Sequence, residues 1–303
     1  MSKPILPALS LAAVPGRRRW TVELAAEIER RGFAGIYCAS FGDGMALCEA
    51  LAFATKHIPF GTSIAPIYTR HVVDWAQMAS FIHELSGGRF RFGVGVSHDA
   101  MMSRMGIATG RPLADARKFV EELRAVPRVG ELPPLVLATL RVKMIALAGE
   151  LADGIVFANA SRSHMAESLA ALPKARRDDA DFFIGDMIPT CVSDDLEAAR
   201  AVNRRTLSGY VSLPNYRNYW KEAGYVEEME AVEKALAAGE RERLPSLLSD
   251  AWLDDATLSG PVSRIREGVE AWIEAGVRTP ILVPSSAQGN QVKAFEEIFA
   301  AFA

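Results

Sequence analysis

The sequence predicts an α/β fold of the (β/α)8 barrel class, and two observations support this prediction. Apolar segments of strand length alternate with segments whose apolar residues recur at helical spacing, and the alternation occurs eight times. Because each new parallel strand needs a right-handed crossover, eight repeats favour a closed barrel. The length of 303 residues is typical of one such domain. We therefore expect a single barrel domain over residues 1–303.

Local signals place the individual elements. Gly32 follows the first expected helix and Gly87 follows the third, as is common at helix C-termini. Pro112 suits the first position of another helix. The expected strands cover residues 5–13, 33–39, 60–67, 89–96, 134–138, 154–158, 182–192 and 280–284. The expected helices cover residues 21–31, 45–57, 70–85, 112–125, 142–152, 163–172, 265–275 and 292–302.

One segment interrupts the alternation. Residues 207–258 contain no convincing strand pattern, but they contain two charged helical patterns and an aromatic run. We predict a helical insertion between the seventh and eighth strands. Its aromatic residues fit a lid, a subunit contact or ordinary packing, and they are Tyr210, Tyr216, Tyr219 and Trp220.

The composition disfavours several classes of partner. The chain has 34 basic and 37 acidic side chains without a long run of either sign, which argues against nucleic acid and anionic membranes. Three cysteines without paired spacing are typical of buried, reduced thiols. Prolines break the N-terminal apolar stretch, its arginines follow instead of preceding it, and no segment approaches the length of a membrane span. We expect a cytoplasmic protein that binds a small molecule.

Polar residues gather where the expected strands end, which is where parallel barrels place their functional loops. Of the five histidines, His71 and His98 fall at such ends. No HxH or HExxH spacing indicates a metal site, and no GxSxG motif indicates a nucleophilic serine. An oxidoreductase with an organic cofactor needs few catalytic side chains, because the cofactor carries the chemistry.

The expected helix after residue 138 begins with an unusual charge. Arg141 and Lys143 lie in its first turn, where the helix dipole disfavours cations. A bound anion such as a phosphate would explain this arrangement. The alternative is that both side chains point to solvent.

Gly93 and Gly95 interrupt an expected strand, although glycine weakens strands. A flat ring that approaches the backbone would explain them, and close packing in a tapering barrel is the alternative that periodicity alone favours. The segment lacks the third glycine of a dinucleotide fingerprint.

Three segments resemble the bacterial luciferase-like monooxygenase superfamily, which includes deazaflavin (F420)-dependent reductases and dehydrogenases. They are TSIAPIYTRH with ELSGGRFRFGVGVSHD, then PPLVLATLRVKMIALAGELADGIVFANA, and finally SGPVSRIREGVEAWIEAGVRTPILVP. They match the family's strand end in RH, its helix end in LSxGR, its glycine-rich fourth strand, its ADG turn and its final helix and strand. The resemblance implies FMN or F420 as cofactor and a homodimer.

The resemblance also implies roles for particular residues. The Ser63–Ile64 bond matches a non-proline cis peptide that bulges against the flavin or deazaflavin ring, and residues 139–141 match the phosphate-binding segment. The residues implied for cofactor binding are Ser63, Ile64, Gly93, Gly95, Ser97, Thr139, Leu140, Arg141 and Asn159.

Candidate catalytic residues are His98, Asp43 and His71. Asp43 approximates an acidic residue of the family, although the usual DH or EH pair is missing because Gly44 follows. His98 replaces a small or acidic residue of many relatives and is our candidate acid or base.

The predicted activity is that of a flavin- or deazaflavin-dependent oxidoreductase acting on a small organic substrate by hydride transfer or oxygenation. The TRH segment resembles F420 reductases, whereas RFRFG resembles luciferases. Two other classes stay open: a non-catalytic or degenerate flavin-binding barrel, and a metal-dependent barrel hydrolase.

Overall fold

The computed structural model describes residues 6–40 and 42–303, and the strands within them form one sheet with the order of a closed (β/α)8 barrel. The predicted fold class is therefore confirmed. By internal packing the chain divides into unit 1 (Met1–Val156 and Ala171–Gly185) and unit 2 (Phe157–Ala170 and Asp186–Ala303). Ile5 of the expected first strand and Phe41, in an expected loop, lie outside the described residues.

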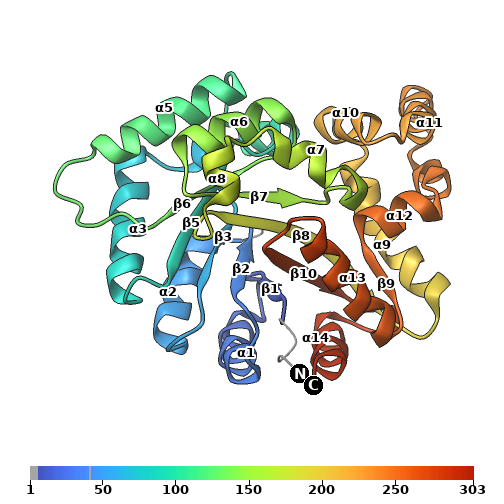
Figure 1. Ribbon diagram of the computed structural model, residues 1–303, viewed down its shortest axis with the longest axis horizontal. Coiled ribbons are helices and arrows are strands. Elements are labelled where there is room, and N and C mark those ends of the chain that lie inside the picture. Colours follow the sequence, from blue (N-terminus) through green and yellow to red (C-terminus); the bar gives the residue numbers. More distant parts are fainter. Residues whose placement is uncertain (1–5, 41) are drawn as a thin grey trace. The chain divides into compact units, whose positions relative to one another are not determined.

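Unit 1 holds a series of parallel strands with helices outside them (Figure 1). The register pairs Ile36 with both Leu9 and Phe60, and Phe60 in turn with Phe90. These positions are fully buried, as expected for parallel strands covered on both faces. The strands are β1 (Ala8–Leu11), β2 (Ile36–Ala39), β3 (Phe60–Ser63), β4 (Ala65–Pro66), β5 (Phe90–Gly95), β6 (Leu135–Ala138) and the first part of β7 (Gly154–Ala158).

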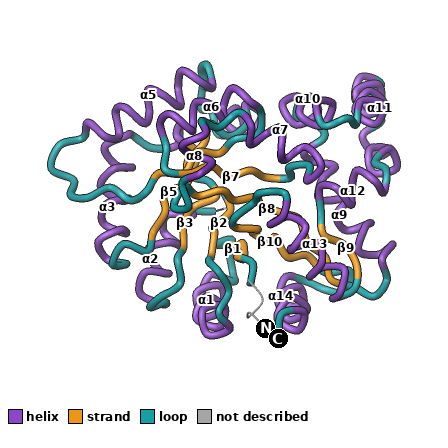
Figure 2. The backbone as a smooth tube through the Cα atoms, in the orientation of Figure 1, coloured by secondary structure: helices purple, strands orange, loops and turns teal. Residues whose placement is uncertain are grey.

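The helices of unit 1 follow the predicted alternation, as the smooth backbone trace of Figure 2 shows. They are α1 (Arg18–Arg31), α2 (Gly44–Ala54), α3 (Val72–Leu85), α4 (Asp99–Arg104), α5 (Pro112–Ala125), α6 (Val142–Leu151) and α8 (Lys174–Asp178). Helix α1 ends at Gly32, whose left-handed backbone lets its N–H reach the carbonyl groups of Ile28 and Glu29. The short helices α4 and α8 were not predicted, because so few residues show no periodicity.

Arg89 joins β5 to the C-terminal end of α2. Its guanidinium donates hydrogen bonds of 3.0 to 3.1 Å to the carbonyl groups of Ala52, Thr55 and Ile58, and one of 2.8 Å to the Thr55 hydroxyl. The charge also lies 5.2 Å from the centre of the Phe60 ring. The carbonyl groups at the end of a helix lack partners within the helix, so Arg89 completes the hydrogen bonding of α2.

We expect Arg89→Met to lower the free energy of unfolding by about 3 kcal/mol, because it leaves several carbonyl groups without a charged donor. Urea denaturation measures this difference. Arg19→Met on the exposed face of α1 is the matched control and should change stability by less than about 0.5 kcal/mol. Equal effects of the two substitutions would contradict a bracing role for Arg89.

Unit 2 contains the rest of β8 (Phe183–Val192) and the segment predicted as an insertion. That segment is helical, although its first helix begins earlier, at Leu196. Strand β9 was not predicted; its three residues pair in parallel with β8 through Thr190 and Leu258. The other elements are η2 (Arg162–His164), α7 (Met165–Ala170), α9 (Leu196–Tyr210), α10 (Pro214–Glu222), α11 (Val226–Ala237), η3 (Arg241–Leu247), α12 (Asp250–Ala256), β9 (Leu258–Gly260), α13 (Val262–Glu274), β10 (Thr279–Ser285) and α14 (Gln291–Ala301).

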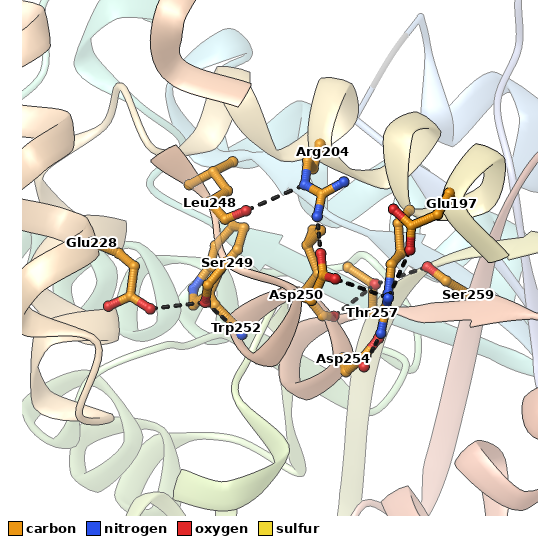
Figure 3. Close-up of polar contacts among 12 residues, drawn as sticks. Glu197, Arg204, Glu228, Leu248, Ser249, Asp250, Trp252, Asp254, Thr257 and Ser259 are labelled. Atoms are coloured by element: carbon orange, nitrogen blue, oxygen red, sulfur yellow. Dashed lines mark hydrogen bonds and ion pairs between the residues drawn. The ribbon is translucent and has the colours of Figure 1, made fainter. Parts of the chain in front are cut away.

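A network of ion pairs holds α9 against α12 (Figure 3). Arg200 contacts Asp250 at 2.9 Å and Asp254 at 2.7 Å, and Arg204 also pairs with Asp250. Burial raises the pKa of Asp254, but the bonds from Arg200 and Arg264 outweigh it and the pKa is lowered. The Asp254 carboxyl group therefore remains ionised, and its ion pair with Arg200 fixes α12, from which the chain enters β9. Within residues 6–40 and 42–303, no helix is long and apolar enough to cross a membrane.

Candidate functional site

The peptide bond between Ser63 and Ile64, at the end of β3, is cis, as predicted. The chain continues directly into β4, which pairs with the end of β5. The Ser63 hydroxyl is buried and has no hydrogen-bond partner among the described residues. A buried hydroxyl without a protein partner is available to a ligand or a water molecule.

Close packing explains both glycines of β5. A Cβ atom on Gly93 would lie 1.9 Å from the carbonyl oxygen of Thr62, and one on Gly95 would lie 2.8 Å from the Cβ atom of Ala138. The same added atom on Gly95 would lie 3.1 Å from the Ile64 side chain. The strands could not approach so closely with larger residues, which is the explanation that periodicity favoured. Because Gly95 has no side chain, it adds no bulk beside Ile64.

Helix α6 begins with the predicted cationic residues and without a side-chain cap. Arg141 is the N-cap, with extended backbone, and Lys143 lies exposed in the first turn. The Thr139 hydroxyl is buried and has no partner among the described residues, and Leu140 is buried beside it. Unpaired N–H groups, two cations and an available hydroxyl are suitable for binding a phosphate.

Asp43 is held by hydrogen bonds on both of its oxygens. One oxygen caps α2 by accepting from the N–H groups of Met45 and Ala46 at 3.2 Å, and the other accepts from Arg70 at 2.5 Å. The Arg70 guanidinium in turn lies 5.1 Å from the centre of the Trp75 ring. These contacts suit a residue that positions the loops after β2 and β4 better than one that transfers a proton.

The two candidate histidines differ in environment. His71 is exposed and caps α3, where its Nδ1 accepts a hydrogen bond of 3.3 Å from the N–H of Val73. His98 follows β5 and is half-buried, and its carbonyl group begins α4. Burial lowers the pKa of His98, and the charge of Asp99 only partly opposes this. A neutral imidazole therefore predominates at pH 7, which is the form that accepts a proton. The preceding Ser97 has a left-handed backbone, with φ of 59°.

Asn159, also predicted to bind the cofactor, belongs to unit 2. Its backbone is left-handed, with φ of 56°, and its carbonyl group accepts a hydrogen bond of 3.3 Å from the Trp220 indole. Two residues further along the same loop, Ser161 donates its N–H to the Tyr219 hydroxyl at 3.0 Å. The side chains of Tyr216, Tyr219 and Trp220 are buried, so they pack within unit 2.

Asp186 was not among the predicted site residues. This residue of β8 is fully buried, and neither carboxyl oxygen has a hydrogen-bond partner among the described residues. Burial raises its pKa to about 7, although the nearby N–H groups of Ala160 and Met187 oppose the shift. A carboxyl group within the otherwise apolar expected strand 182–192 was the signal available in the sequence. In the described part of the chain, no group of three or more His, Cys, Asp or Glu side chains is placed to hold a metal ion.

Comparison with known structures defines the fold class further. The chain matches the F420-dependent tetrahydromethanopterin reductase of Methanopyrus kandleri with a TM-score of 0.74 and 15% identity, over 97% of each chain. It matches the oxygenating constituent of 3,6-diketocamphane monooxygenase of Pseudomonas putida, solved with FMN, with a TM-score of 0.68 and 15% identity, over 99% of this chain and 96% of the other. Both similarities concern the fold.

The family model of luciferase-like monooxygenases matches residues 8–279, and the chain belongs to this family. A 5,10-methylenetetrahydromethanopterin reductase of Methanolobus tindarius is 24% identical over 89% of this chain and 91% of its own length. The predicted family is confirmed, and these relatives agree with the predicted class of flavin- or deazaflavin-dependent oxidoreductase. They are enzymes, so nothing among them supports the non-catalytic alternative.

We expect Asp186→Asn to remove a pH-dependent destabilisation. A carboxyl group whose pKa is raised on folding stabilises the native state fully below its ordinary pKa, near 4, and loses that contribution as the pH rises through about 7. The stability of the variant relative to the native sequence should therefore increase by about 4 kcal/mol between pH 4 and pH 8.

Denaturant unfolding across this pH range measures the difference. Asp181→Asn, at an exposed position, is the control and should show no such trend. A constant difference between Asp186→Asn and the native protein would mean that the Asp186 carboxyl group is not perturbed by burial.

Proposed function

We propose that this protein is an F420-dependent oxidoreductase whose cofactor site lies at the strand ends of unit 1. The observation that carries the proposal is the combination of an uncapped, cationic N-terminus of α6 with the buried, unpartnered hydroxyls of Ser63 and Thr139. Such groups fit the phosphate and polar side chain of a flavin-type cofactor. The F420-dependent reductase among the structural neighbours, with the higher of the two TM-scores given above, supports F420.

The residues of unit 1 divide the work as follows. Arg141, Lys143 and Thr139 would bind the phosphate. The cofactor ring would pack on the Ile64 side chain, where Gly95 leaves space because it has no side chain. When bound, F420 supplies a two-electron hydride carrier. His98 would accept the proton that a small organic substrate releases as it gives up a hydride, because its imidazole is largely neutral at pH 7.

The Asp43–Arg70 ion pair positions this site. It ties the capped start of α2 to the loop that follows β4. His71 fixes the start of α3 through its cap. We assign Asp43 and His71 to positioning, and only His98 to proton transfer.

FMN-dependent oxygenation is the second candidate, because the neighbour solved with FMN shares the fold over nearly the whole chain. Titration of the protein with F420 and with FMN, followed by fluorescence, separates the two. We expect F420 to bind at least tenfold more tightly. Tighter binding of FMN would replace the first candidate by the second, and binding of neither would refute the proposed site.

We expect Lys143→Gln to weaken FMN binding about three- to tenfold without affecting riboflavin, which lacks the phosphate. The substitution also removes an unfavourable charge from the helix N-terminus, so the unliganded protein should gain a few tenths of a kcal/mol in stability. Fluorescence titration and thermal unfolding measure the two effects. Lys118→Gln on α5 is the matched control. An equal loss for FMN and riboflavin would rule out a phosphate at α6.

We further propose a cytoplasmic homodimer. Phe53 of α2 and Phe81 of α3 are 72% and 53% exposed on helices that pack together in unit 1, and exposed apolar patches often mark interfaces. The buried, free cysteines suit a reducing compartment.

We expect Phe53→Ser combined with Phe81→Ser to convert the dimer to a monomer, because the two substitutions remove both exposed aromatic rings from the proposed interface. Light scattering coupled to gel filtration measures the mass. Val226→Ser, at another exposed apolar position, should leave the mass unchanged. A dimer that persists in the double variant would place the interface elsewhere.

A further inference from the structure

Unit 2 contains a cavity of about 290 Å³ between η2, the end of α12, β9 and α13. This volume is near the lower end of the range for ligand pockets, so the cavity suits a small organic molecule. Its lining includes apolar and charged side chains, among them Arg162, Asp254, Leu258, Glu267 and Ala271. None of the lining residues belongs to the proposed cofactor site, so the cavity has no part in the function proposed above.

The floor of the cavity is apolar because α13 packs closely on β9. A Cβ atom on Gly268 of α13 would lie 2.3 Å from the Cδ2 atom of Leu258, so only a residue without a side chain allows this approach. Leu258 is buried in consequence, and Ala271 lies almost one turn further along α13. The two side chains provide an apolar surface for part of a ligand.

Hydrogen bonds between η2 and α12 place Arg162 at this cavity. The N–H and the hydroxyl of Ser163 donate to the two carboxylate oxygens of Asp255, at 2.8 and 2.7 Å. Ser163 directly follows Arg162, so the same bonds fix the backbone that carries the Arg162 guanidinium. The side chain is half-buried, and its backbone is held in place without the help of a ligand.

The other arginine of the cavity is already paired. Arg264 contacts Asp254 at 2.7 Å, and Asp254 also pairs with Arg200 at 2.7 Å, within the network of Figure 3. Cations and anions are equal in number in this network, which consists of Arg200, Arg204, Arg264, Glu197, Asp250 and Asp254. The network is therefore balanced within the protein and needs no ligand.

Arg162 and Glu267 are different. Within residues 6–40 and 42–303, neither side chain forms a hydrogen bond or an ion pair, with the other or with any third residue. Two opposite charges that line one cavity without contact suit a molecule that bears both signs. A guanidinium binds a carboxylate through two parallel hydrogen bonds, and a carboxylate accepts from an ammonium group.

We propose that this cavity binds a free α-amino acid with a small apolar side chain. The ligand's carboxylate accepts from Arg162, its ammonium group donates to Glu267, and its side chain packs on Leu258 and Ala271. A phosphate is a poorer ligand, because the negative charges of Asp254 and Glu267 line the same cavity. The site does not depend on the proposed cofactor.

Calorimetric titration with L-leucine and two of its analogues tests the proposal. The analogue 4-methylpentanoate lacks the ammonium group, and leucinamide lacks the carboxylate. We expect L-leucine to bind at least tenfold more tightly than either analogue, because each analogue loses one charge-assisted interaction. A protein that binds no L-leucine, or that binds either analogue equally well, would overturn the proposal.

Two substitutions assign the charges. Arg162→Gln should weaken the binding of L-leucine about tenfold and leave leucinamide unaffected, since leucinamide has no carboxylate. Glu267→Gln should weaken L-leucine to the level of 4-methylpentanoate and leave 4-methylpentanoate unaffected. Unchanged binding of L-leucine in either variant would contradict the assignment.

Matched controls use exposed residues of unit 2 that do not line the cavity. Arg241→Gln of η3 and Glu270→Gln of α13 remove the same charges and should leave the binding of L-leucine unchanged. A loss as large in these controls would show that only the net charge of the protein matters, and it would overturn the proposed site. Binding of F420 and FMN is measured separately, so failure here leaves the proposed function untouched.

Discussion

The candidate site of unit 1 depends on the close approach of the β3 and β5 backbones. The carbonyl oxygen of Thr62 lies where a side chain on Gly93 would be. The Thr62 hydroxyl also donates to the Gly93 carbonyl group at 2.6 Å, so the strands are joined at this point from both sides. Directly after it come the Ser63–Ile64 bond and the polar strand end. The position of the candidate site therefore depends on a residue that contributes no side chain.

Electrostatics complements this packing. The start of α2 is neutralised by the Asp43 carboxylate, which also accepts from Arg70, whereas the start of α6 carries cations and no cap. The N–H groups at the start of α2 have a protein acceptor, whereas the start of α6 is suited to a bound anion. This difference between two helices of the same unit separates a structural terminus from a binding terminus, and helix propensity alone would not distinguish them.

Much of this could be predicted from the sequence, and the failures have physical reasons. The expected helix at 112–125 and the expected strand at 154–158 coincide with α5 and β7, because the first has apolar residues at helical spacing after a proline and the second is a short apolar run. The Ser63–Ile64 bond followed from the family resemblance, since no local pattern specifies a cis peptide. Strand β9 and the ion pair of Asp43 with Arg70 were missed because they depend on partners distant in sequence. Asp186 was overlooked because a single charge does not disturb an apolar pattern.

The Tyr219 hydroxyl accepts a hydrogen bond from the loop after β7 and the Trp220 indole donates one to it, so the segment 207–258 does more than fill space. A barrel loop is usually free to change in length without consequence for its neighbours. Here, part of the loop's backbone hydrogen bonding is supplied by side chains some sixty residues further along the chain. Loop and insertion are therefore expected to change together in evolution. Either one, transferred alone into another barrel, would lack the hydrogen-bond partners that the other supplies.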